Sequence, residues 1–118
     1  MVPRDPEALL PLKPVVFQIL MSLVDSEQHG YAIVQDIAER SSARMRIKPG
    51  NLYRTLRDML EDGLIEESER RPAADSHDER RRYYRITRFG RRVAAAEAAR
   101  LVDLVADARA RRLLKARA

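Results

Sequence analysis

The sequence predicts a mainly α-helical fold with a small β-hairpin: a winged helix-turn-helix with an N-terminal arm and a long C-terminal helix. Three observations predict it. Two amphipathic helical patterns, joined by a short link, follow one apolar helix, as in a helix-turn-helix. Next comes a hairpin pattern flanked by arginines. The last helical pattern is longer than a small domain needs.

Length and composition narrow the classes of protein. The chain has 118 residues, the length of one domain. It has no cysteine and two histidines, which excludes a disulfide framework and a thiolate metal site, and we expect no metal and no cofactor. The longest apolar stretch, residues 15–24, is too short to span a bilayer, and the first residues have no signal-peptide pattern. We therefore expect a cytoplasmic protein without a membrane partner.

Residues 1–13 are predicted to form the arm, because prolines interrupt them while their leucines make them too apolar for a free tail. The winged helix-turn-helix domain is predicted at 14–87. Its first helix begins at Pro14 and is apolar on nearly all sides, so it should be buried. Residues 25–30 have turn composition, and a second helix is predicted at 31–41. Alternating charged and apolar residues at 44–48 predict a very short strand.

The third helix, predicted at 48–62, has the clearest end signals. Pro49 suits its first position and Gly63 the position after its end. Strands are predicted at 64–71 and 79–86, with a polar loop between them. Thr87 is a predicted N-cap for a helix from Arg88 to about Lys115. Residues 88–118 are therefore predicted to be a C-terminal dimerisation helix, since its far half extends past any core that this chain can build.

The charges are unevenly distributed. Residues 1–43 have a net charge of −3, residues 44–92 of +5 and residues 93–118 of +3. The positive charge therefore begins at Arg44, which indicates an anion-binding surface in the middle of the chain. Charge alone leaves open the alternative that these arginines are simply solvated.

The residue types in this region suit contact with double-stranded DNA. Asparagine can bond adenine, arginine can bond guanine or phosphate, and a helix N-terminus favours anions. We expect the third helix to enter the major groove, and the wing at 64–86 to touch the backbone or the minor groove. The candidate DNA-binding residues are Lys48, Asn51, Tyr53, Arg54, Arg57, Arg70, Arg71, Arg80, Arg81 and Arg82.

Four motifs in order resemble the PadR family of bacterial transcriptional regulators: His29-Gly30-Tyr31, Pro49-Gly50-Asn51-Leu52-Tyr53, Glu61-Asp62-Gly63-Leu64-Ile65, and Tyr83-Tyr84-Arg85-Ile86-Thr87 with Gly90. The resemblance covers roughly residues 14–92. It implies a dimeric winged-helix repressor of a palindromic operator, associated with the nucleoid when bound, and the short C-terminal region resembles the smaller subclass. One departure is Lys48-Pro49-Gly50-Asn51, where Ser-Pro-Gly-Thr is usual.

A homodimer follows from the long final helix, whose apolar side lacks partners within the chain. The candidate interface residues are Leu9, Leu10, Leu12, Leu101, Leu104, Val105 and Ala108. Since the chain has no separate ligand domain, a small-molecule effector would bind within the dimer, between the final and first helices. The candidate lining residues are Phe17, Met21 and Leu101.

Three alternative functions differ in the support that the sequence gives them. The serines lack a matching histidine and aspartate constellation and no glycine-rich phosphate loop occurs, so we expect no catalytic residues and no enzyme activity. A winged-helix protein-interaction module and a non-specific architectural DNA-binding protein remain as alternatives. The basic wing and the cationic start of the third helix favour DNA over a protein partner.

Overall fold

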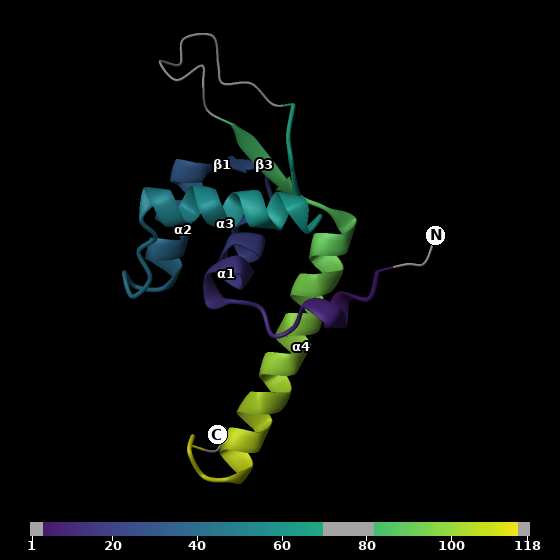
Figure 1. The fold of residues 1–118 in the computed structure, drawn as a ribbon. Helices are drawn as coiled ribbons and strands as arrows, with labels where there is room; N and C mark the ends of the chain where they lie inside the picture. Colours follow the sequence, from purple (N-terminus) through teal and green to yellow (C-terminus); the bar gives the residue numbers. More distant parts are fainter. Residues whose placement is uncertain (1–3, 70–81, 116–118) are drawn as a thin grey trace.

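A computed structural model describes residues 4–69 and 82–115. Helices dominate it, with a small antiparallel sheet between them (Figure 1). The elements, in order, are a 3-10 helix η1 (Pro6–Leu9), α1 (Pro14–Leu23), β1 (Gln28–His29), α2 (Gly30–Arg40), α3 (Pro49–Glu61), β2 (Ile65–Glu67), β3 (Tyr83–Ile86) and α4 (Arg88–Ala110). This architecture confirms the predicted fold class.

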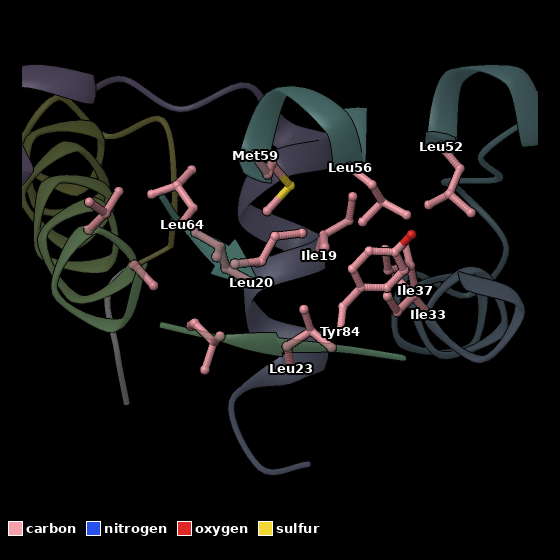
Figure 2. Close-up of a cluster of buried hydrophobic side chains, with 14 residues drawn as sticks. Ile19, Leu20, Leu23, Ile33, Ile37, Leu52, Leu56, Met59, Leu64 and Tyr84 are labelled. Atoms are coloured by element: carbon pink, nitrogen blue, oxygen red, sulfur yellow. The ribbon is translucent and has the colours of Figure 1, made fainter. Parts of the chain in front are cut away.

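The core is built around α1, which is apolar on most sides, as the sequence predicts. Ile19 and Leu20 of this helix are fully buried, with α3 on one side and the sheet on the other (Figure 2). Each amphipathic helix contributes its apolar stripe, and Tyr84 and Ile86 point inward from β3. The other buried core residues are Leu23, Ile33, Ile37, Leu52, Leu56, Met59, Leu64, Ile65, Val93 and Ala94.

The sheet differs from the prediction in its third strand and in the lengths of the other two. Residues 28–29, within a predicted turn, form β1, while β2 ends at Glu67 and β3 begins at Tyr83, inside the predicted ranges. Its order is β1-β3-β2, and β3 pairs antiparallel with both neighbours, Gln28 opposite Tyr84 and Ile65 opposite Ile86. The strand predicted at 44–48 is wrong, because both edges of β3 are already taken by β1 and β2. The alternation there has a simpler cause: Met45 and Ile47 are half-buried against the core, while the charged residues between them are exposed.

The proline and glycine signals at the helix ends are confirmed, while several boundaries differ from the prediction by one or more residues. Pro14 and Pro49 occupy first positions, and Gly63 has a φ of 75° just after α3. The second helix begins one residue earlier than predicted, where Nδ1 of His29 accepts a hydrogen bond from the Ala32 N–H (3.2 Å). The last helix is shorter than predicted and ends at Ala110.

The start of α4 is fastened tightly to the start of β2. Oγ1 of Thr87 accepts a hydrogen bond from the Gly90 N–H (2.9 Å) and donates to the carbonyl of Gly63 (2.6 Å). At Gly90 the two backbones almost touch, because a Cβ there would lie 2.1 Å from the carbonyl oxygen of Leu64. Only glycine fits this position, so the direction of α4 relative to the domain is fixed here.

The arm packs along α4, next to the first half of that helix (Figure 1). The Arg4 guanidinium stacks 4.3 Å from the centre of the Phe89 ring and donates to the Asp62 carbonyl at 2.5 Å. Further along α4, Glu97 is only 2% exposed. Arg100 holds its carboxylate through two bonds of 2.6 and 2.9 Å.

The Glu97 carboxyl group has a lowered pKa. The hydrogen bond from Arg100 is the largest cause, burial opposes it, and the backbone N–H of Leu12 in the arm lowers the pKa further. The arm is thus attached to α4 at both ends, through Arg4 and through Leu12. Glu97 is a buried charge that the apolar pattern of the helix did not reveal.

We expect Glu97→Gln to lower the free energy of unfolding at pH 7 by about 1.5–3 kcal/mol, the contribution of hydrogen bonds to a charged group. Because the folded-state pKa lies below the ordinary value of 4.5, this contribution is present above that value and is lost as the pH falls through the folded-state pKa. Urea denaturation at pH 7 and pH 3 measures it.

The matched control is Asp103→Asn, an exposed carboxylate of the same helix, which should leave stability unchanged at both pH values. An equal loss for Glu97→Gln at pH 7 and pH 3 would contradict a role for the ionised carboxylate.

Candidate nucleic-acid interface

The exposed face of α3 carries the candidate contacts from the sequence. Successive residues of a helix are rotated by about 100°, so Arg54 lies opposite the buried stripe, with Gly50 and Arg57 beside it. Tyr53 lies at the edge facing the sheet and is 60% exposed. Asn51 lies at the other edge and is also exposed. The structure therefore places four of the predicted residues in one exposed arc of α3, and Lys48 is the exposed N-cap residue before it.

The N-terminal turn of α3 has no side-chain cap. Lys48 is the N-cap residue and its side chain accepts no hydrogen bond from the turn. The first backbone N–H groups therefore lack a side-chain partner at the positive end of the helix dipole. An anion placed there would meet these N–H groups and the Lys48 ammonium together.

A polar network fixes α2 against α1 and so supports α3. The Asp36 carboxylate accepts from Ser22 Oγ (2.7 Å) and from Arg40 Nε (2.9 Å), and Arg40 also reaches Gln18 of α1 (2.5 Å). The hydrogen bond from Ser22 is the largest cause of the lowered pKa of Asp36, with Arg40 adding to it against the effect of burial. The network joins the two helices on which the position of α3 depends.

The wing is described only at its base. Arg82 has a 74% exposed side chain and pairs with Glu67 across the strands at 3.2 Å. Arg85 pairs with Glu66 at 2.7 Å, which is the main reason for its raised pKa. Four predicted contacts, Arg70, Arg71, Arg80 and Arg81, lie outside the described residues.

Two cationic residues near α3 were not on the candidate list. A cleft of about 380 Å³ lies beside this helix, lined in part by Lys13, Met45, Arg46, Asn51 and Arg54. Arg46 comes from the link before α3, and Lys13 from the end of the arm. The alternation of charged and apolar residues at 44–48 could have identified Arg46, because Met45 and Ile47 turn inward and Arg46 therefore turns outward.

The residues predicted for the dimer interface and the effector pocket differ in how far they are buried. Leu9, Leu10 and Leu12 of the arm are half-buried against this chain's own core. On α4, Leu101 and Ala108 are half-buried, while Leu104 and Val105 are 50% and 39% exposed. Phe17 is half-buried and Met21 is 38% exposed. Neither of the two clefts beside α3 is lined by Phe17, Met21 or Leu101.

Two further properties concern the described residues only. No described helix is both long enough and apolar enough to cross a membrane. Within 4–69 and 82–115, no group of three or more histidine, aspartate or glutamate side chains is arranged to hold a metal ion.

Known structures share this fold. A transcriptional regulator from Clostridium thermocellum is 25% identical, with a TM-score of 0.62 over 79% of this chain and 86% of that one. A PadR family transcription regulator from Clostridium difficile is 23% identical, with a TM-score of 0.64 over 80% and 96% of the two chains. Bacillus subtilis PadR, solved in complex with operator DNA, is 20% identical, with a TM-score of 0.60 over 73% and 47%.

The comparison with curated proteins finds no significant match. The sequence model of the transcriptional regulator PadR-like family, however, matches residues 19–96, from the middle of α1 to the middle of α4. This match covers most of the chain, and it includes the helix-turn-helix, the wing and the fastened start of α4. The chain therefore belongs to the PadR-like family of transcriptional regulators.

Proposed function

We propose that this protein is a homodimeric, sequence-specific DNA-binding repressor of a palindromic operator. The observation that carries the proposal is that cationic side chains without ion pairs gather on the exposed face of α3. Arg40, Arg82, Arg85 and Arg100 each pair with a carboxylate. Within the described part of the chain, Arg54 and Arg57 of α3 form no ion pair and are exposed. Their charges are left for an anionic partner.

The proposed docking places α3 in the major groove. Arg54 and Asn51 then face base edges, while Lys48 and the free N–H groups of the first turn meet phosphate. Gly50 supports a close approach, because a Cβ there would meet nothing within 4 Å in the chain, so the fold itself does not require glycine. The wing, with Arg82 at its base, would contact the backbone or minor groove. The operator complex of the Bacillus subtilis relative supports DNA as the partner class.

The proposed dimer rests on the single apolar stripe of α4. Gly90, Val93, Ala94 and Glu97 are its buried first half. At helical spacing, Leu101, Leu104, Val105 and Ala108 continue the same stripe, but nothing in the described chain covers Leu104 and Val105. The second half of α4 also projects away from the rest of the molecule (Figure 1). A second copy of the helix would cover it.

An effector, where one acts, is proposed to bind in the dimer between α4 and α1. Phe17 and Met21 lie on α1 and Leu101 on α4, and all three retain exposed surface. A ligand there would change the orientation of the two winged domains relative to the paired α4 helices. The two α3 helices would then no longer fit the operator together, and DNA would be released.

We expect Arg54→Ala to weaken binding to the operator by about 1–3 kcal/mol, and to weaken binding to random DNA less, because a base contact is lost. Arg57→Ala should weaken both DNAs alike and reduce the slope of log K against log salt by about one, as for one lost phosphate contact. Fluorescence anisotropy at several salt concentrations, on an operator selected from a random library, measures both.

The control is Arg92→Ala, which removes the same charge from an exposed position on the far side of α4. Gly50→Ala is a second probe: it should leave stability unchanged or slightly higher and still weaken binding. Equal losses on operator and random DNA for every variant would favour a non-specific architectural protein. Unchanged affinity for Arg54→Ala and Arg57→Ala combined would contradict DNA binding by this face and favour a protein-interaction module.

We expect Val105→Glu to convert the dimer to a monomer, because it places a charge in the uncovered stripe of α4. Light scattering should give twice 13.6 kDa for the unaltered protein and about 13.6 kDa for the variant. Val102→Glu is the matched control, since Val102 is more exposed (66%) but lies off the stripe. An unaltered protein of 13.6 kDa at micromolar concentration would overturn the dimer.

A further inference from the structure

Residues 111–115, which follow α4, form a turn in which every residue is exposed in the described part of the chain. After Ala110 the chain reverses: Arg112 has a φ of 64°, and the Leu113 N–H donates to the Ala108 carbonyl (2.9 Å). This is a Schellman-type end with arginine where glycine is usual, a strained choice. It presents Leu113 and Leu114, which are 77% and 46% exposed. We call residues 111–115 the C-terminal hook.

A groove with apolar and acidic lining residues lies between the arm and α3. It holds about 340 Å³, and we call it the arm groove. Leu9, Leu12 and Val16 contribute apolar surface to its lining. Asp58, Glu61 and Asp62 of α3 and its C-cap contribute three carboxylates, and Lys13 contributes one ammonium group. In the described chain none of these three carboxylates forms an ion pair, since Arg4 bonds the backbone carbonyl of Asp62 and not its side chain. The groove therefore combines apolar surface with an excess of negative charge, three carboxylates against the single ammonium of Lys13.

We propose that the hook of one subunit occupies the arm groove of its partner in the homodimer. The inference rests on the proposed function, because it requires the α4-mediated dimer. Two exposed leucines match the apolar surface, and Arg111, Arg112 and Lys115 match the three carboxylates. A two-fold dimer makes this contact twice, with each subunit supplying one hook and one groove.

Helix geometry brings the two surfaces together. The uncovered stripe runs from Leu101 to Ala108, so its midpoint falls between Leu104 and Val105. Two antiparallel α4 helices that cross at this midpoint place Glu97 of one subunit opposite Arg112 of the partner subunit. Glu97 is where the arm is attached, through the N–H of Leu12. The crossing that best buries the stripe therefore delivers the hook to the partner's arm.

The hook cannot make the same contact within its own chain. Glu97 and Arg111 belong to the same straight helix or its cap, and 14 residues of helix span about 20 Å. The end of α4 accordingly lies well away from the arm and α3 in Figure 1. Only a second copy supplies a groove at the correct distance.

Cross-linking tests the contact directly, since the 118 residues contain no cysteine. One preparation carries Glu61→Cys at the rim of the groove, and another carries Leu113→Cys in the hook; both positions are exposed. After subunit exchange and mild oxidation, we expect a covalent dimer that forms only when both preparations are mixed. Disulfides require Cα atoms within about 7 Å, so the product reports direct proximity.

Two controls make the result specific. Glu66→Cys is also at an exposed position but lies on β2 of the wing, and it should give no product with Leu113→Cys. Separately, Arg111→Glu with Arg112→Glu should raise the dimer dissociation constant several-fold. Adding Asp58→Lys and Glu61→Lys to that chain should restore it, because the charges are then complementary again.

The outcomes separate the two proposals. Light scattering that shows a dimer, together with no mixed disulfide and no charge-reversal rescue, would overturn the hook contact and leave the dimer standing. A disulfide formed within single chains carrying both cysteines would also overturn it, since the hook would then occupy its own groove. A monomeric unaltered protein would overturn the dimer itself.

Discussion

The rest of the structure depends on the backbone contact at Gly90, where α4 leaves the sheet. The Leu64 carbonyl lies so close that no side chain fits, and Thr87 ties the same two segments through hydrogen bonds. Because α4 is one continuous helix, a direction fixed at Gly90 is fixed along its length. The first half of its apolar stripe is then used in the core, and the second half is presented to solvent at a set angle.

This constraint links the two proposed tasks of the chain. The winged domain presents unpaired cations on α3, and the projecting half of α4 presents unpaired apolar surface. Since both are rigidly joined through Gly90 and through the arm at Glu97, the dimer would hold two α3 helices at a fixed separation. A fixed separation is what a palindromic site requires of its protein. Elsewhere, described arginines such as Arg40 and Arg100 are used internally, joining helices or the turns of one helix.

Local signals in the sequence were sufficient for most of the fold. Proline at Pro14 and Pro49, the cap at Thr87 and the 3.6-residue spacing of Leu52, Leu56 and Met59 each act within a few residues, and the structure confirms them. Pairing of strands is not local. The alternation at 44–48 reports only which side chains turn inward, and it gives no information about the edge of β3, which β1 occupies instead.

For the candidate site, too, the sequence predicted local features but not contacts between distant segments. Exposed residues of α3 were predictable, because a helix with one apolar stripe exposes the rest. Ion pairing was not, since it joins residues such as Arg85 and Glu27 that lie far apart in the sequence. The left-handed turn at Arg112 was also missed, because arginine gives no signal for it and the helical pattern continues to Lys115.

We propose that two winged domains, held by paired α4 helices, bind DNA as a symmetric unit. Hydroxyl-radical footprinting on an operator selected from a random library tests it most directly. A symmetric dimer should give two protected segments related by two-fold symmetry, with centres about one helical turn apart or a multiple of it. A single unsymmetric protected segment, or uniform weak protection without boundaries, would contradict it.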